Sequence, residues 1–257
     1  MTIGRGHFGR LNIALLLAAI GGVGLFILVE TRTTSPLIRM VMFRDPVLSG
    51  SLAMSTLVST VMMATLVVGP FYLFRGLGLT VALVGLVLSA GPLVAALTGI
   101  PAGRLVDRFG AHRMTIVGLL GIAGGSTLLS VMPTKFGIAG YVAPIVVITS
   151  SYALFQAANN TVIMTDIRPD QRGVISGMLS LSRNLGLITG ASVMGAVFAI
   201  ASATTDITTA RPEAVATGMQ VTFAVAAVLL VIALVIAVGS RALRGRLSPE
   251  VDPVIAG

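Results

Sequence analysis

Residues 217–239 read TGMQVTFAVAAVLLVIALVIAVG, a stretch of 23 residues without a single charge. A helix that crosses a bilayer needs roughly 20 predominantly apolar residues, whereas a strand of a membrane barrel alternates apolar and polar residues over about ten. This stretch therefore predicts a transmembrane helix. Six further stretches are long and apolar enough to predict the same: 11–29, 47–74, 79–103, 114–132, 137–163 and 173–203.

The composition supports an all-α polytopic membrane protein with seven transmembrane helices. Of its 257 residues, 55% are hydrophobic and 10% are charged, against about a quarter charged in a typical soluble domain. The net charge is +8, but the basic residues other than Arg183 lie in connecting segments and form no patch, so no nucleic-acid partner is expected. With no cysteine, and with His7 and His112 far apart outside the spans, neither a metal site nor a cofactor is expected.

The orientation follows from the basic residues on the two sides of the seven spans. One side carries Arg5, Arg10, Arg75, Lys135 and Arg211. The other side carries Arg32, Arg39, Arg44, Arg104, Arg108, Arg113, Arg168, Arg172, Arg241, Arg244 and Arg246. Because basic loops face the cytoplasm, we expect a multi-pass protein of a bacterial cytoplasmic (inner) membrane, surrounded by membrane lipids, with the N-terminus outside and the C-terminus cytoplasmic.

The segment between the third and fourth spans reads GRLVDRFGAHR over residues 103–113. It resembles the signature loop of the major facilitator superfamily, in which glycine, three residues, Asp-Arg, one residue, glycine and then basic residues join the second and third helices of a six-helix half. Ala111 and His112 depart from this pattern, which prefers two basic residues there. The candidate gating residues are Gly103, Arg104, Asp107, Arg108, Gly110 and Arg113.

The resemblance implies that this loop gates the cytoplasmic side. A carboxylate such as Asp107 can sit at the positive end of a neighbouring helix, arginines can pair with acidic groups or lipid phosphates, and glycines permit close backbone approach. Such contacts would hold the cytoplasmic side in one state and break in the other. The alternative is a basic turn that only sets the topology.

Two other stretches resemble the fourteen-helix drug:proton antiporters of this superfamily. Residues 26–32 read FILVETR and precede Pro36-Leu37 and Met42-Phe43-Arg44, as in the segment after the extra linker helices of that subgroup. Residues 169–186, which end in RNLG, are similar to its penultimate helix.

This resemblance implies three regions. A linker helix and a cytoplasmic connection would occupy 1–46, a six-helix C-terminal bundle of two inverted three-helix repeats would occupy 47–240, and a cytoplasmic tail would occupy 241–257. It also implies that an N-terminal transporter half, in the same or a separate chain, is a partner.

In this superfamily the first helix of each repeat lines a central cavity, which points to spans 47–74 and 137–163. The candidates for contact with a small-molecule substrate are Ser55, Ser59, Met62, Met63, Tyr152, Gln156, Asn159 and Asn160. Polar groups within a bilayer need a partner or water, and methionines suit a pocket that accepts varied apolar molecules. Hydrogen bonding between helices, or simple packing of the methionines, explains the same residues without a ligand.

Span 173–203 carries Ser182, Gly186 and Gly190 at steps of four, a small-residue face suited to close helix contact. The resemblance to the superfamily places this helix against the N-terminal half. Arg183 lies about ten residues into the span, roughly 15 Å from its start. This intramembrane charge is expected either to pair with a carboxylate of the other half or to extend to the cytoplasmic interface.

Proton coupling needs a carboxylate that titrates within the membrane, but all nine acidic residues lie in loops, in the tail or at span ends. This chain alone is therefore not expected to perform coupled transport. The leading interpretation is the C-terminal half of a proton-coupled exporter of drugs or other amphipathic small molecules that works by alternating access. The alternative is a truncated or decayed membrane protein that acts at most as a structural partner. An enzyme is not expected, because no paired carboxylates, histidine cluster or nucleophile with a base is present.

Overall fold

The computed structural model describes residues 43–165, 167–203 and 211–247, together with five single positions between 17 and 28. The expected span 11–29 and the end of the expected tail, 248–257, therefore lie essentially outside the described residues. The chain divides into two compact units, Met1–Arg44 and Asp45–Gly257. The second unit holds nearly all of the described residues.

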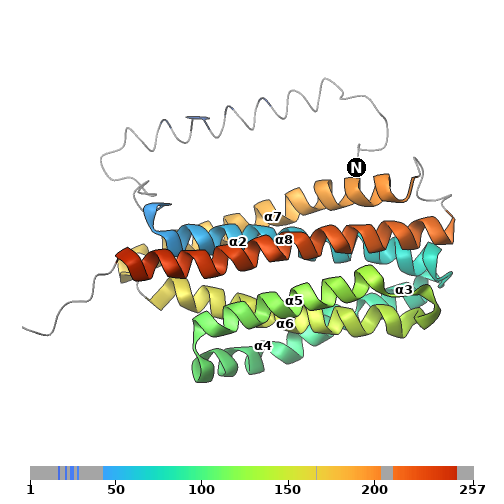
Figure 1. Ribbon diagram of the computed structural model, residues 1–257, viewed down its shortest axis with the longest axis horizontal. Coiled ribbons are helices and arrows are strands. Elements are labelled where there is room, and N and C mark those ends of the chain that lie inside the picture. Colours follow the sequence, from blue (N-terminus) through green and yellow to red (C-terminus); the bar gives the residue numbers. More distant parts are fainter. Residues whose placement is uncertain are drawn as a thin grey trace, which may run out of the picture. The chain divides into compact units, whose positions relative to one another are not determined.

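All regular structure in the described part of this unit is helical (Figure 1). The long helices are α2 (Pro46–Phe71), α3 (Val81–Leu88), α4 (Ala90–Phe109), α5 (Ala111–Val131), α6 (Gly137–Thr165), α7 (Arg172–Ala201) and α8 (Pro212–Leu247). Three short segments join or extend them: the π-helical turn η2 (Tyr72–Gly76) and the 3-10 turns η3 (Thr134–Phe136) and η4 (Pro169–Gln171).

Six helical segments in the described part of the chain are long and apolar enough to cross a membrane. They are Pro46–Gly76, Val81–Phe109, Ala111–Val131, Thr134–Thr165, Pro169–Ala201 and Pro212–Ser240. The sequence-based spans from 47–74 onward are thus confirmed as apolar helices. Two ends differ from expectation, because α4 continues to Phe109 and α8 continues to Leu247, into the region expected as tail.

Local chemistry explains where the helices begin and end. Asp45 caps α2, since its carboxylate accepts a hydrogen bond from the Val47 amide at 2.9 Å and Pro46 occupies the first turn. The span Val81–Phe109 breaks at Ser89, between α3 and α4. It breaks there because Pro92 has no N–H to donate to the carbonyl of Leu88. Gly110 separates α4 from α5 with φ 88° and ψ 136°, a conformation that is essentially restricted to glycine.

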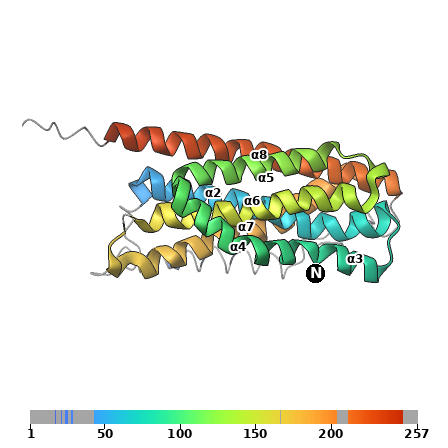
Figure 2. The same ribbon diagram turned by 90° about the horizontal axis from the view of Figure 1, so that it is seen from below.

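The six spans form two triplets of consecutive helices, α2 to α5 and α6 to α8, with α3 and α4 counted as one span. Helix α7 packs along α2 and α4 packs along α6, while α5 packs on α6, α8 packs on α2, and α5 and α8 pack on each other (Figures 1 and 2). If α2, α4 and α5 are exchanged with α6, α7 and α8 respectively, this pattern of contacts is unchanged. Because each triplet has an odd number of spans, the second starts on the opposite side of the membrane from the first, as inverted repeats do.

Burial differs strongly among the spans. Half of the most apolar window of the α2 span is buried, against 11% for the span of α3 and α4. The core is formed by α2, α5, α6 and α8, with fully buried side chains such as Val58, Leu119, Phe155 and Phe223. Helices α4 and α7 are therefore the outlying members of the bundle, each attached mainly to one central helix.

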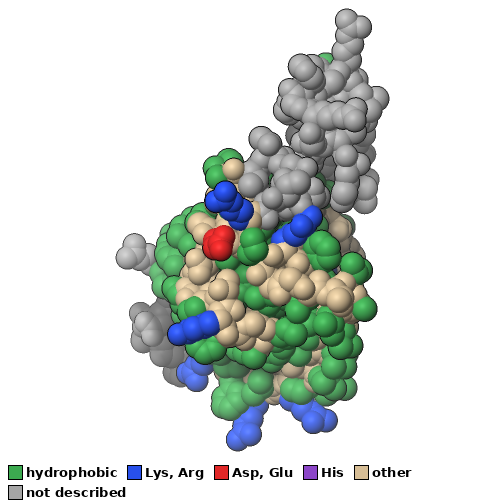
Figure 3. All heavy atoms as spheres, turned by 90° about the vertical axis from the view of Figure 1, so that its right-hand side faces the viewer, with side chains coloured by type: hydrophobic (Ala, Val, Ile, Leu, Met, Phe, Trp, Pro, Cys, Tyr) green, Lys and Arg blue, Asp and Glu red, His purple; other side chains and the backbone are tan. Residues whose placement is uncertain are grey.

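The end of the bundle at which α8 begins carries scattered charge. In the view of this end, basic side chains are separated by apolar and other polar groups and form no continuous patch (Figure 3). Arg75 and Lys135 each lie over a neighbouring phenylalanine ring, at 5.4 Å from its centre. The charge visible at this end is therefore dispersed.

Candidate functional site

The resemblance places α7 against the N-terminal half, but in this structure the small-residue face of α7 packs against α2 of the same bundle. A Cβ atom added at Gly186 would lie 2.3 Å from the carbonyl oxygen of Thr56, and one added at Gly190 would lie 2.6 Å from that of Thr60. Both obstacles are backbone atoms, which side-chain movement cannot displace. We call this contact between α2 and α7, built on Gly186 and Gly190, the glycine seam.

Threonine hydroxyls cross the glycine seam. The Thr56 hydroxyl lies 3.1 Å from the carbonyl of Leu52 in its own helix and 3.2 Å from that of Ser182 in α7. The Thr60 hydroxyl lies 2.9 Å from the carbonyl of Thr56 in its own helix and 3.1 Å from that of Gly186 in α7. Thr60 also lies within hydrogen-bond distance of Thr189, at 3.3 Å between the hydroxyl oxygens. Close backbone approach and hydroxyl donors across two helices are the devices that hold helices together in lipid.

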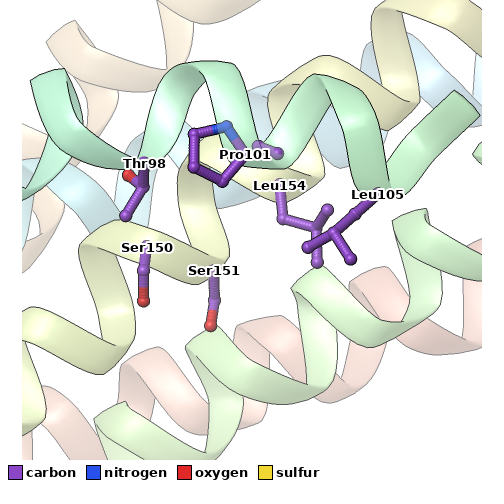
Figure 4. Close-up of a pocket in the computed structure, with 7 residues that line it drawn as sticks. Thr98, Pro101, Leu105, Ser150, Ser151 and Leu154 are labelled. Atoms are coloured by element: carbon purple, nitrogen blue, oxygen red, sulfur yellow. The ribbon is translucent and has the colours of Figure 1, made fainter.

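The equivalent contact in the other triplet, between α4 and α6, borders an open cavity of about 230 Å³. In Figure 4, Thr98, Pro101 and Leu105 project from α4, and Ser150, Ser151 and Leu154 project from α6. The hydroxyls of Thr98 and Ser150 donate to carbonyls of their own helices, those of Val94 and Val146, each at 2.7 Å. They therefore do not tie the two helices together. We call this space the α4–α6 cavity.

None of the residues that line the α4–α6 cavity was a sequence-based candidate. They carry no motif, and a mixture of small, hydroxyl and apolar residues is typical of any helix contact in a membrane. The one usable signal is Thr98 and Ala102, four residues apart on one face of α4. That spacing predicts that this face of α4 contacts another helix, but it does not predict a cavity between them.

The substrate candidates divide into a buried set and an accessible set. Ser55, Ser59 and Asn159 are buried, at 4%, 1% and 1% exposure, and so lie inside the bundle. The half-buried set comprises Met62, Met63, Tyr152, Gln156 and Asn160. Only the second set can meet a molecule on the surface of this bundle without a rearrangement.

Asn159 belongs to a polar cluster between α6 and α2. Its amide Nδ2 donates to the Ser55 hydroxyl at 3.0 Å, while its Oδ1 and the Ser51 hydroxyl have no hydrogen-bond partner among the described residues. A cavity of about 10 Å³ adjoins them and is also lined by His112 and Ser240, at the lower limit of space for one water molecule. Asn159 thus joins helices in this structure.

Arg183 reaches from α7 to the polar face of α6. Its Nη1 donates to the Gln156 Oε1 at 3.3 Å, and its Nη2 donates to the Ser180 hydroxyl at 3.4 Å. Sequence reasoning named Arg183 and Gln156 separately, and the structure brings them together. The charge therefore joins the accessible set of substrate candidates.

The loop at 103–113 is exposed and bound to little else in the described bundle. Asp107, Arg104 and Arg113 make no ion pair within the described residues, and the Arg108 guanidinium lies over the Phe109 ring at 5.3 Å. A Cβ atom at Gly103 or Gly110 would meet nothing within 4 Å. The expected close backbone approach at these glycines is therefore not borne out within the described chain, where Gly110 instead supplies a positive φ.

Acidic and metal-binding groups are sparse in the described residues. The carboxylates there are those of Asp45, Asp107, Asp170 and Glu213, and each lies at a helix end or in a turn. No group of three or more histidine, cysteine or acidic residues that could hold a metal ion occurs in the residues that the structure describes.

Comparison with known families places this architecture. A profile of the Major Facilitator Superfamily matches residues 11–191 and also 52–255, which together cover nearly the whole chain. The chain belongs to the Major Facilitator Superfamily. Proteins of this superfamily are membrane transporters, not enzymes, so the chain is a multi-pass membrane protein of a transporter family.

Two curated members of the superfamily show measurable identity. The uncharacterized transporter YebQ of Escherichia coli (strain K12) is 31% identical over 159 residues, which are 62% of this chain and 35% of YebQ. The quinolone resistance protein NorB of Staphylococcus aureus (strain Newman) is 29% identical over 202 residues, which are 77% of this chain and 43% of NorB. The chain thus spans about two fifths of the length of the relatives that it matches.

Proposed function

We propose that this superfamily chain is the C-terminal half of a secondary active transporter that exports drugs or other amphipathic small molecules by alternating access, coupled to protons. The six-helix bundle supplies one wall of the transport pathway, and an N-terminal half, in the same or a separate chain, supplies the other. The similarity to NorB, whose name specifies quinolone resistance, supports drug export. The excess of basic residues in alternate loops supports a cytoplasmic C-terminus in a bacterial cytoplasmic membrane.

One observation carries the proposal: the polar face of α6 is not sealed inside the bundle. Tyr152, Gln156 and Asn160 are half-buried and lie in the C-terminal half of a 29-residue helix, and Gln156 binds Arg183 of α7. Amide, phenol and guanidinium groups facing hydrocarbon are costly. Such a face calls for a water-filled cavity or a second polar wall, and a transporter made of two halves provides both.

Export can be tested in the native host. Cells with and without the chain are loaded with fluorescent amphipathic dyes, and the retained dye is measured before and after a protonophore is added. We expect cells without the chain to retain several-fold more dye, and the protonophore to abolish the difference. Equal retention of every dye would contradict export and would favour a structural role instead. A difference that survives the protonophore would contradict proton coupling alone.

The gating loop can be tested in the same assay. Asp107→Asn removes the carboxylate with little change in size, so dye export should fall several-fold while the amount of protein in the membrane stays constant. Thr127→Val is a suitable control, because the Thr127 hydroxyl is exposed and donates only to the carbonyl of Ala123 in its own helix. Wild-type export by Asp107→Asn would reduce the loop to a topology-setting turn.

A further inference from the structure

Arg183 lies close to the middle of its span. Helix α7 runs from Arg172 to Ala201, so its midpoint falls after Gly186. At 1.5 Å per residue, Arg183 is about 5 Å from that midpoint along the axis. A charge at this depth is costly unless it faces a polar cavity or a partner of opposite charge, and it is therefore a candidate functional group.

The charge of Arg183 is not balanced in the described bundle. Both of its hydrogen-bond acceptors, Gln156 and Ser180, are neutral. The single ion pair among the described residues joins Arg168 to Asp170 at 3.4 Å, and the other described carboxylates lie at helix ends or turns far along the sequence. The guanidinium is thus held in place by neutral groups with its positive charge still unmatched.

The unused hydrogen-bond donors of Arg183 and Gln156 match the acceptors of a carboxylate. A guanidinium has five N–H donors in a planar fork that matches a carboxylate with two parallel bonds, and only two of these donors are used here. Gln156 accepts through its Oε1, so its amide NH₂ points elsewhere and has no hydrogen bond among the described residues. The two side chains therefore offer several donors, and Gln156 orients the guanidinium.

A methionine of α2 borders α7 further along the helix, beside the glycine seam. A Cβ atom at Gly190 would lie 2.8 Å from the Cβ of Met63, so this half-buried methionine borders α7 at that level. Gly190 is seven residues from Arg183, about 10 Å along the axis. A charged anchor and a soft, adaptable methionine wall at this separation suit a molecule with an anionic head and an apolar body.

We propose that Arg183 and Gln156 bind the carboxylate of an amphipathic small-molecule substrate. The proposal rests on the export function proposed above and specifies its substrate class: amphipathic carboxylates and zwitterions, in preference to purely cationic compounds. Arg183 makes the charge contact, and Gln156 is both a donor to the substrate and a positioning residue for the guanidinium.

The test compares two probes that differ in charge and otherwise by a single methyl group. The purified chain in phosphatidylcholine nanodiscs is titrated with dansyl-leucine and with its uncharged methyl ester, and binding is followed by fluorescence anisotropy against empty nanodiscs. We expect the wild type to bind the carboxylate at least ten-fold more tightly than the ester. Arg183→Gln should reduce this ratio to about one, and Arg183→Lys should retain part of it.

Two further variants keep the result interpretable. Arg75→Gln changes the net charge by the same amount at the exposed end of the α2 span, and it should keep the wild-type ratio. Gln156→Leu retains the charge but removes its orienting partner, so the ratio should fall several-fold even if Arg183→Gln fails to fold.

The titration has three outcomes that would overturn the proposal. Equal binding of acid and ester by the wild type would overturn the carboxylate site and leave the export function to the dye assay. Binding of neither probe would also overturn the site. The same titration of the complete transporter distinguishes the source of the carboxylate. If the preference exists in the chain alone and disappears when the N-terminal half is present, the carboxylate belongs to that half and the substrate proposal is wrong.

Discussion

The glycine seam and the α4–α6 cavity occupy equivalent positions in the two triplets, yet they are built in opposite ways. At the seam, Gly186 and Gly190 let α7 approach until backbone lies against backbone. At the cavity, Pro101 and Leu105 of α4 face Ser150 of α6 across about 230 Å³ of space. The topology places a helix pair at both sites, and the pair is closed where α7 carries glycines against α2.

The largest expected effect on stability comes from adding a methyl group at the glycine seam, which prevents the close approach of α2 and α7. Gly186→Ala places a Cβ against the Thr56 carbonyl, so α2 and α7 must separate, at a cost of about 3 kcal/mol. The midpoint of thermal unfolding in detergent, followed by circular dichroism, should fall by roughly 6–12 °C. The control is Gly99→Ala on α4, where an added Cβ meets nothing within 4 Å. Equal midpoints for the two variants would remove the distinction between seam and cavity.

A smaller loss is expected when a hydroxyl is removed from the seam. Thr60→Val keeps the shape of the side chain but removes its contacts with Gly186 and Thr189. Hydrogen bonds between membrane helices contribute about 0.6 kcal/mol on average and up to about 1.7 kcal/mol, so a loss near 1 kcal/mol is expected. Denaturant titration in mixed micelles can resolve this difference, and unchanged stability would show that the close backbone approach suffices.

Filling the α4–α6 cavity should have a small effect of the opposite sign. Ser150→Leu extends an apolar side chain into the space that Figure 4 shows, and each buried methylene contributes about 0.8 kcal/mol before the lost hydroxyl bond is subtracted. We expect the unfolding midpoint to stay constant or rise by up to about 3 °C. A fall comparable to that of Gly186→Ala would show that α4 is packed as tightly as α7.

The smallest effect is expected for Thr98→Val. The Thr98 hydroxyl donates to Val94 within α4 and does not reach α6. Its removal should therefore change stability by less than about 0.5 kcal/mol, as for surface substitutions without a specific partner. Thr60→Val and Thr98→Val make the same chemical change at the two equivalent contacts, and a larger loss at Thr98 would reverse the comparison.

Much of the fold was predictable because lipid imposes simple rules. Length and hydropathy located the six described spans to within a few residues at most ends, since a span must satisfy its backbone internally and cross a fixed thickness. The break at Ser89 was not predicted, because prolines such as Pro92 and Pro144 occur within membrane spans and only the packed structure shows which of them interrupts a helix.

The candidate site was less predictable, for a physical reason. A polar residue in a span can face a cavity or a neighbouring helix, and helical spacing does not distinguish the two. Ser55 and Asn159 shared the pattern of Met62 and Gln156, yet they bond to each other inside the bundle. The pairing of Arg183 with Gln156 joins residues from two helices. It can be predicted only when the arrangement of the two triplets is known.

The two glycines of the 103–113 loop differ in how much sequence change they can accept. Gly103 is helical with open space around it in the described bundle, so the folding of this bundle should accept many side chains there, limited by helix preference. Gly110 has equally open surroundings, but its backbone at φ 88° and ψ 136° strains every other residue, asparagine included. A deep mutational scan should therefore find one permissive and one intolerant position seven residues apart, and the intolerance at Gly110 should owe nothing to its neighbours.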